Sequence, residues 1–148
     1  MAEKFYARPS GFTRWMNSVM GALVARGIGP KKMAQLEIKG RKSGVVRSVA
    51  VNLLNYDGRR YLVAPRGETE WVRNARAAVG EAVLRRGKPK NVTVTEIPVG
   101  ERAPIIQAYL RENAWATQRE FGVSPKAPIN EFEAIADKHP VFKITPRA

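Results

Sequence analysis

The sequence predicts a mainly β protein of about six antiparallel strands, arranged as a barrel or strongly twisted sheet with helices on its outside. Most of the predicted strands are joined by short turns, of which Asp57-Gly58 is the strongest hairpin signal. Strands do not alternate regularly with helices, and no Gly-x-Gly-x-x-Gly follows a strand. These two observations argue against a parallel doubly wound sheet and a dinucleotide site. The length of 148 residues predicts a single domain over 1–148.

The first predicted element is an amphipathic helix at about residues 10–25. Its apolar residues recur at spacings of three and four, and Gly27, Gly29 and Pro30 end it. The apolar positions are Phe12, Trp15, Met16, Val19, Met20 and Leu23. We expect this stripe to pack on the barrel beside a ligand pocket, with a second role on an anionic membrane surface.

The strand predictions begin at residues 33–39, where apolar and polar residues alternate, and continue after a turn at 40–44 with a long β-branched strand at 46–56. Asn130 is the expected N-cap of a late helix. The remaining elements are a strand at 59–64, a helix at 71–78, a hairpin of 81–86 and 91–97 around 87–90, helices at 105–114 and 130–138, and a last strand at 141–144.

Composition limits the chemistry. Lys plus Arg outnumber Asp plus Glu by 26 to 13, and the net charge of +13 favours anionic partners such as nucleic acid, acidic lipid or a phosphorylated small molecule. The absence of cysteine excludes disulfides, thiolate nucleophiles and Cys-ligated metals. A single histidine excludes a multi-histidine metal site, so we expect no metal. We expect that histidine, His139, to be a cation at a helix C-terminus.

The sequence contains no membrane-spanning or secretory signal. No stretch reaches the roughly 18 apolar residues of a membrane span. The N-terminus lacks an apolar segment followed by a small-residue cleavage site. We therefore expect a cytoplasmic protein, with peripheral contact at the inner face of the membrane through its N-terminal helix.

A basic turn stands between two predicted strands, in the run KGRKSGVVRSVAVN at residues 39–52. Arg41, Lys42, Ser43 and Arg47 gather there. One interpretation is a solvated hairpin tip. The other is an anion site, because a tight turn can present backbone N–H groups, a hydroxyl and several cations to one ligand.

The run LEIKGRKSGVVRSVAVNLLNYDGRRYLVA, followed by EWVRNARA, resembles the deazaflavin-dependent nitroreductase and quinone reductase family of actinobacteria. The resemblance covers about residues 36–78 and implies a split β-barrel of the flavin-reductase-like, FMN-binding type. It implies coenzyme F(420), an 8-hydroxy-5-deazaflavin whose tail carries a phosphodiester and several glutamates. FMN fits less well, because its single phosphate leaves part of the cationic cluster unpaired.

Carried over by position, the resemblance assigns cofactor contacts to eleven residues. Those for the phosphate and tail are Arg41, Lys42, Ser43 and Arg47. Those along or at the edge of the ring are Ser48, Val49, Ala64, Pro65 and Arg66. Those that close the pocket wall are Trp71 and Asn74.

The resemblance also implies an activity, the transfer of hydride from reduced coenzyme F(420) to a small apolar acceptor. Quinones, activated alkenes and nitro compounds are the expected acceptors. Tyr109 or solvent would deliver the proton. Trp15, Tyr109 and Trp115 are the candidate substrate-pocket residues, with Phe121 beside them. The expected state is a monomer or homodimer.

Two other functional classes compete with a reductase. The first is a protein that binds a deazaflavin or an acyl lipid on the same barrel without turnover. The second is nucleic-acid binding driven by the net charge. Against it, aromatic and basic residues are not interleaved on one strand face as a stacking platform requires, so we expect no nucleic-acid partner.

Overall fold

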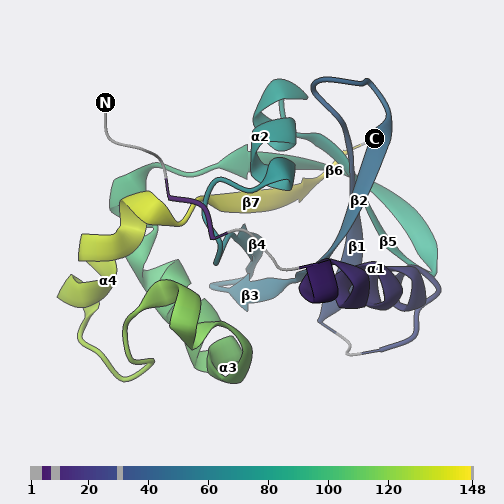
Figure 1. Cartoon of the computed structure of the whole chain (residues 1–148). Coiled ribbons are helices and arrows are strands. Elements are labelled where there is room, and N and C mark those ends of the chain that lie inside the picture. Colours follow the sequence, from purple (N-terminus) through teal and green to yellow (C-terminus); the bar gives the residue numbers. More distant parts are fainter. Residues whose placement is uncertain (1–4, 8–10, 30–31, 148) are drawn as a thin grey trace.

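The computed structural model describes residues 5–7, 11–29 and 32–147, except for the side chains of residues 13, 17, 115 and 116. Within this part of the chain, seven strands form one antiparallel sheet in the order β2-β1-β5-β6-β7-β4-β3. The strands are β1 (Met33–Lys39), β2 (Val46–Asn52), β3 (Leu54–Tyr56), β4 (Arg59–Val63), β5 (Glu81–Arg86), β6 (Lys88–Glu96) and β7 (Val141–Pro146). The mainly β, antiparallel fold class is confirmed (Figure 1).

The sheet is curled, because its two edge strands are consecutive in the chain. The prediction of one strand over residues 46–56 is wrong, since it breaks at Leu53 into β2 and β3. Asn52 pairs with Met33, the first residue of β1, so β2 can extend no further along its partner. The Leu53 N–H instead donates to the Lys32 carbonyl at 2.7 Å, and β3 then pairs with β4.

The core lies on both faces of this sheet. One cluster fills the inside of the curl, and its most fully buried large side chains include Leu36, Leu62, Val72, Val92 and Phe142. A second cluster packs the outer face of β4 and β7 against helices. In β4, Leu62 belongs to the first cluster and its neighbours Tyr61 and Val63 to the second. The strand period of two therefore decides which layer each residue fills.

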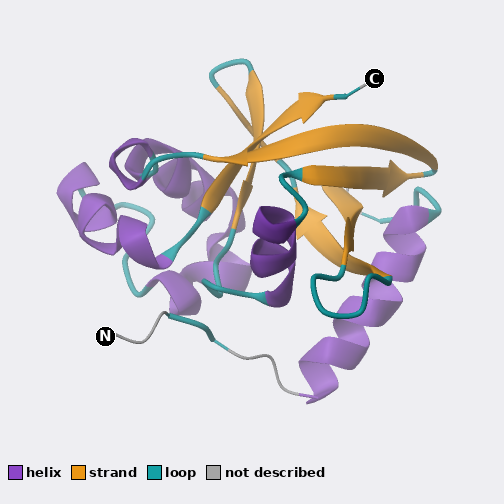
Figure 2. Ribbon diagram, turned by 90° about the horizontal axis from the view of Figure 1, so that it is seen from above, coloured by secondary structure: helices purple, strands orange, loops and turns teal. Residues whose placement is uncertain are grey.

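The helices surround the sheet. They are α1 (Gly11–Ala25), α2 (Glu70–Ala77), α3 (Ala103–Phe121) and α4 (Ile129–Ile135), with short 3-10 helices at Val99–Glu101 and Ala136–Lys138. Figure 2 shows α3 and α4 on the side of the sheet opposite α1. The helix expected at 105–114 continues to Phe121. The expected N-cap Asn130 lies inside α4, whose N-cap is Pro128.

The second hairpin is tighter than expected, because Gly87 alone joins β5 to β6. Two of its basic residues, Arg85 and Arg86, make contacts within the protein. Arg85 donates to the Glu37 carboxylate at 2.9 Å across the sheet. Arg86 donates to the carbonyls of Met33 and Gly29, each at 2.9 Å. These contacts tie the segment between α1 and β1 to the hairpin.

Helix α1 packs on the sheet through a face different from the expected one. Val24 is fully buried, and a Cβ on Gly21 would lie 3.5 Å from the Gln35 side chain. The apolar stripe points away, with Trp15 64% and Met16 49% exposed, so the expectation that it packs on the barrel is wrong. No helix in the described residues is long and apolar enough to cross a membrane.

Candidate functional site

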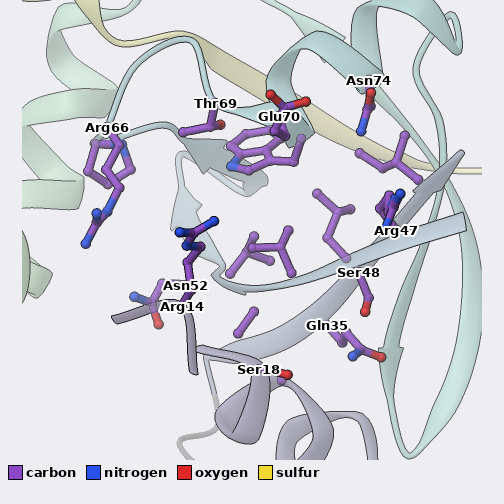
Figure 3. A pocket seen from close by; sticks show the side chains of 18 of the residues that line it. Arg14, Ser18, Gln35, Arg47, Ser48, Asn52, Arg66, Thr69, Glu70 and Asn74 are labelled. Atoms are coloured by element: carbon purple, nitrogen blue, oxygen red, sulfur yellow. The ribbon is translucent and has the colours of Figure 1, made fainter. Parts of the chain in front are cut away.

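A cavity of about 990 Å³ follows the free edge of β2, where the curled sheet stays open. All residues of β2 from Arg47 to Asn52 line it, together with parts of α1, β1, the turn at 40–43, the loop at 63–69, α2 and α3. Its size lies at the upper end of the range of about 300–1,000 Å³ that is common for ligand pockets. Figure 3 shows Arg14, Asn52 and Arg66 at one side of the cavity and Arg47, Ser48 and Asn74 at the other.

The basic turn is shaped by its two glycines and by Ser43. Gly40 N–H donates to the Val45 carbonyl at 2.8 Å, and a Cβ at position 40 would come within 2.9 Å of the same oxygen. Gly44 has a φ of +74°, a conformation that favours glycine. Ser43 Oγ accepts from the Val45 N–H at 3.1 Å. The Ser43 hydroxyl therefore stabilises the turn as well as facing the cavity.

Asn74 of α2 holds this turn in place. Its side chain is buried, and its Oδ1 accepts from both the backbone N–H and the guanidinium of Arg41. The Arg41 guanidinium also donates to Glu70 at 2.7 Å, and this hydrogen bond is the main cause that lowers the pKa of the Glu70 carboxyl. Arg41 is thus already paired within the protein.

Two cations of the predicted set stay available. Lys42 and Arg47 are exposed at the cavity and form no hydrogen bond or ion pair with a described residue. Five cationic side chains line the cavity, against the carboxylates of Glu70 and Glu120. The five are Arg14, Arg41, Lys42, Arg47 and Arg66. The potential in the cavity therefore favours an anionic ligand.

The wall residues predicted from the resemblance also meet at the cavity. The half-buried Trp71 indole lines it and packs on Phe142, with ring centroids 5.4 Å apart. Ser48 and Val49 line it from β2. Leu36, Ile38 and Val51 add buried apolar surface. A flat apolar ring could pack against this wall.

His139 holds the loop after β4 in place through a hydrogen bond to its first residue, Ala64. This imidazole is 1% exposed and lies between Phe5, which it meets edge to face, and the tilted ring of Phe121. Its Nδ1 lies 3.1 Å from the Ala64 carbonyl, and because a carbonyl can only accept, Nδ1–H is the donor. Burial lowers the pKa of His139 to about 4. The expectation of a helix-terminal cation is therefore wrong, since the ring is neutral at pH 7.

The N-terminal segment braces the other side of this loop. Ala7 N–H donates to the Arg66 carbonyl at 2.9 Å and Glu68 N–H to the Phe5 carbonyl at 2.8 Å. Gly67 lies between them with a φ of +81°. Pro65 and Arg66 line the cavity as a result, whereas Ala64 is fully buried and does not.

Tyr109 of α3 reaches the cavity from the second core cluster. It is 3% exposed, and burial raises the pKa of its phenol, while a hydrogen bond with Asn52 opposes the shift. The phenol therefore keeps its proton at neutral pH. Trp15 is exposed and does not line the cavity, and the side chain of Trp115 lies outside the described residues.

The sequence analysis missed several cavity residues, including one on α1 and two near the end of α3. Arg14 comes from the polar side of α1, and Thr117 and Glu120 come from the last turns of α3. At Asn113 the backbone leaves helical geometry, with φ −124° and ψ 21°, and α3 kinks there. The Asn113 side chain donates to the Tyr109 carbonyl at 2.9 Å. Beyond the kink, Thr117 and Glu120 lie on the same cavity as Tyr109.

Among the described residues, no group of three or more Asp, Glu or His side chains could hold a metal ion. What the cavity offers is a cationic entrance, an indole and aliphatic wall, and a polar inner end. Such a site can bind an extended ligand with a charged tail and a flat body.

Comparison with known proteins identifies the fold. No protein-family model and no curated protein matches the chain. An F420-H2 dependent reductase (FDR-A) superposes with a TM-score of 0.50 at 18% identity, over 78% of this chain and 95% of that one. An FAD-binding protein from Mesorhizobium loti has a TM-score of 0.50 at 13% identity, over 88% and 90%. HutZ, a heme storage protein from Vibrio cholerae, has a TM-score of 0.50 at 8% identity, over 80% and 83%.

At these identities the likeness establishes the fold alone. The chain has a split β-barrel fold, as the resemblance predicted. Its structural neighbours differ in what their names say they bind. The ligand and the reaction of this chain therefore have to be argued from its own cavity.

Proposed function

We propose that the chain is a reductase that binds coenzyme F(420) in the cavity along β2 and uses it to reduce a small apolar acceptor. The single observation that carries this proposal is the pair of unpaired cations, Lys42 and Arg47, at the entrance of a cavity whose wall is aromatic and aliphatic. The family resemblance of residues 36–78 and the likeness to an F420-H2 dependent reductase support the same ligand.

The cofactor tail accounts for the cations. A phosphodiester followed by glutamates carries several negative charges, and hydrogen bonds between ions are about twice as strong as neutral ones. Lys42 and Arg47 would bind the tail directly. Arg41 would act differently, because its guanidinium is held by Asn74 and Glu70 and mainly shapes the turn.

The ring would lie along the wall formed by Trp71, Val49 and Val51. When bound and reduced, a deazaflavin supplies the hydride, so the protein needs no nucleophile or metal. The chain's own contribution is to orient the ring, to exclude water and to hold a proton. Tyr109 holds that proton at its phenol oxygen, since burial raises its pKa, and Asn52 orients the group.

The acceptor would bind beside Tyr109 on the apolar wall of the cavity. Quinones, activated alkenes and nitro compounds each take up a hydride and a proton, and Tyr109 is placed to supply the proton. We infer no direct use of NADH or NADPH, because the sequence has no dinucleotide fingerprint. Peripheral membrane contact, cytoplasmic localisation and the state of monomer or homodimer stay predictions.

The proposal is tested by fluorescence titration with coenzyme F(420). Replacing Lys42 and Arg47 by alanine should weaken binding by at least about 2 kcal/mol, or roughly 30-fold, without unfolding the protein. The matched control is the Lys88→Ala, Lys90→Ala variant, which removes the same charge from residues that do not line the cavity. Equal affinity in the two variants would exclude the turn as the tail site.

Turnover separates a reductase from a binding protein. Reduced coenzyme F(420) should be reoxidised in the presence of catalytic amounts of the protein by at least one quinone, alkene or nitro acceptor. If the cofactor binds but no acceptor in such a panel is reduced, the chain is a deazaflavin-binding protein. If no deazaflavin binds at all, the proposed function is wrong.

A further inference from the structure

Near Arg66, two residues that line the cavity each carry a fully buried oxygen atom without a hydrogen-bond partner among the described residues. They are Thr69 Oγ1 and Glu120 Oε2, and both residues line the cavity. Buried polar atoms in folded proteins are nearly always hydrogen-bonded, and a buried carboxylate oxygen is the costlier kind to leave unpaired. Two such atoms at one end of one cavity indicate that a ligand satisfies them.

Arg66 completes this group. Its Nη2 lies 3.9 Å from Glu120 Oε1, which is too long for a hydrogen bond, so the guanidinium keeps its donors for another partner. The Arg66 and Glu120 side chains are only 30% and 18% exposed. The backbone of Arg66 is fixed by its hydrogen bond with Ala7. The end of the cavity thus presents a guanidinium donor, a carboxylate acceptor and a hydroxyl donor.

Figure 3 places Arg66 at the side of the cavity opposite Arg47. A ligand whose charged tail is held at Lys42 and Arg47 would therefore have another part of its structure at Arg66, Thr69 and Glu120. That part must offer at least one hydrogen-bond donor for the carboxylate and acceptors for the two donors. The quinones and nitro compounds proposed as acceptors carry no such donor in their oxidised form.

We propose that Arg66, Glu120 and Thr69 bind the pyrimidine edge of the flavin-type ring, an inference that rests on the proposed function. This edge presents a carbonyl, an N3–H and a second carbonyl, which is an acceptor, a donor and an acceptor. Glu120 accepts from N3–H, and Arg66 and Thr69 donate to the two carbonyl oxygens. Flavins and deazaflavins share this edge, whereas the rim of a heme has no N–H group.

Methylation of N3 gives a direct test. Coenzyme F(420) and its N3-methyl derivative are titrated into the wild-type protein, with riboflavin and 3-methylriboflavin as a second pair without the anionic tail. We expect the methyl group to weaken wild-type binding of coenzyme F(420) by about tenfold or more, the effect of losing a hydrogen bond to a charged group. The riboflavin pair shows whether the edge is read without the deazaflavin ring.

Variants assign the effect to Glu120. Glu120→Met removes the acceptor and should make the two ligands of each pair bind equally, whereas Glu120→Gln keeps an amide oxygen and should retain part of the preference for N3–H. The control is Glu112→Gln on the same helix, whose carboxylate pairs with Lys32 and does not line the cavity. It should leave the preference unchanged.

The outcomes are separable. If coenzyme F(420) binds wild-type protein but its N3-methyl derivative binds equally well, this inference is wrong and the proposed function stands. If the preference for N3–H persists in Glu120→Met, another residue reads the edge and the assignment to Glu120 is overturned. If neither parent ligand binds, both proposals fall. Because the comparison of the parent and N3-methyl ligands uses wild-type protein, it tests this inference even if a variant does not fold.

Discussion

Asn74 Oδ1 accepts two hydrogen bonds from Arg41, one from the backbone N–H at 3.1 Å and one from the guanidinium at 2.8 Å. The two residues are 33 positions apart, and the contact joins α2 to the turn between β1 and β2. One buried amide thus fixes both the path of the turn and the direction of its first arginine. The shape of the anion site therefore depends on α2, a helix that is distant from the turn in the sequence.

Asn74→Ala should therefore loosen the turn. The substitution leaves the Arg41 N–H without its acceptor, and we expect a loss of about 1–3 kcal/mol in the free energy of unfolding together with weaker coenzyme F(420) binding. Urea denaturation and fluorescence titration measure the two effects. Glu70→Gln is the control, because this exposed ion pair contributes at most about 1 kcal/mol. Equal losses in both variants would contradict the role of Asn74.

Gly67→Ala should disrupt the loop that carries Arg66. The position has a φ of +81°, and a Cβ would lie 2.2 Å from the Phe5 carbonyl oxygen. Gly58→Ala at the hairpin tip is a matched control, since Gly58 has a φ of +73° but no neighbour within 4 Å. Both variants carry a backbone penalty of about 1 kcal/mol. If Gly67→Ala lowers the free energy of unfolding more than Gly58→Ala does, as measured by urea denaturation, the difference reports the contact with the N-terminal segment. Equal losses would mean that this segment does not brace the loop.

The stability of the protein should fall as the pH is lowered from about 6.5 toward 4. The folded chain protonates His139 only near pH 4, whereas the unfolded chain does so near 6.5. Between these values the unfolded state binds more protons, so acidification favours unfolding by up to about 3 kcal/mol. Asp137 and Lys138 are the charged groups that influence this pKa. In His139→Leu, chemical denaturation across this window should show a flatter pH dependence; an unchanged slope would exclude His139 as its source.

The exposed stripe of α1 should contribute little to stability. Trp15→Ser with Met16→Ser should change the free energy of unfolding by less than about 0.5 kcal/mol, because most substitutions of exposed residues have effects no larger than this. Val24→Ala on the buried face should cost about 1–3 kcal/mol. Sedimentation with anionic vesicles tests the membrane role predicted from the sequence, and there the stripe variant should bind less. Large destabilisation by the stripe variant would show that these side chains are packed.

The sequence was informative where the structure is local. The hairpin at Asp57-Gly58 forms as predicted, with both residues at positive φ as such a turn requires. The basic turn, Trp71 and Asn74 meet at one cavity because α2 carries both wall residues and its Asn74 binds Arg41 of the turn. The break at Leu53 could not be read from the apolar run, since it depends on where the partner strand β1 begins.

The cavity residues Thr117 and Glu120 could not be predicted for a related reason. Ending the third helix at residue 114 removed Thr117 and Glu120, although 109, 113, 117 and 120 follow helical spacing. The polar residues around Asn113 resemble a helix end in the sequence. In the structure the helix kinks at Asn113 and continues to Phe121. His139 was misjudged because in the sequence it stands at a helix end between Lys138 and Pro140, while its neighbours in space are Phe5 and Phe121.

The position of β7 in the sheet has a consequence for protein synthesis. Among the described residues it is the last strand in sequence, and it pairs with both β6 and β4. Arg47 comes from one half of the sheet and Arg66 from the loop after the other half. Until residues 141–146 have left the ribosome, the nascent chain holds two separate groups of strands. The two groups therefore become one sheet only when β7 has been synthesised and pairs with both.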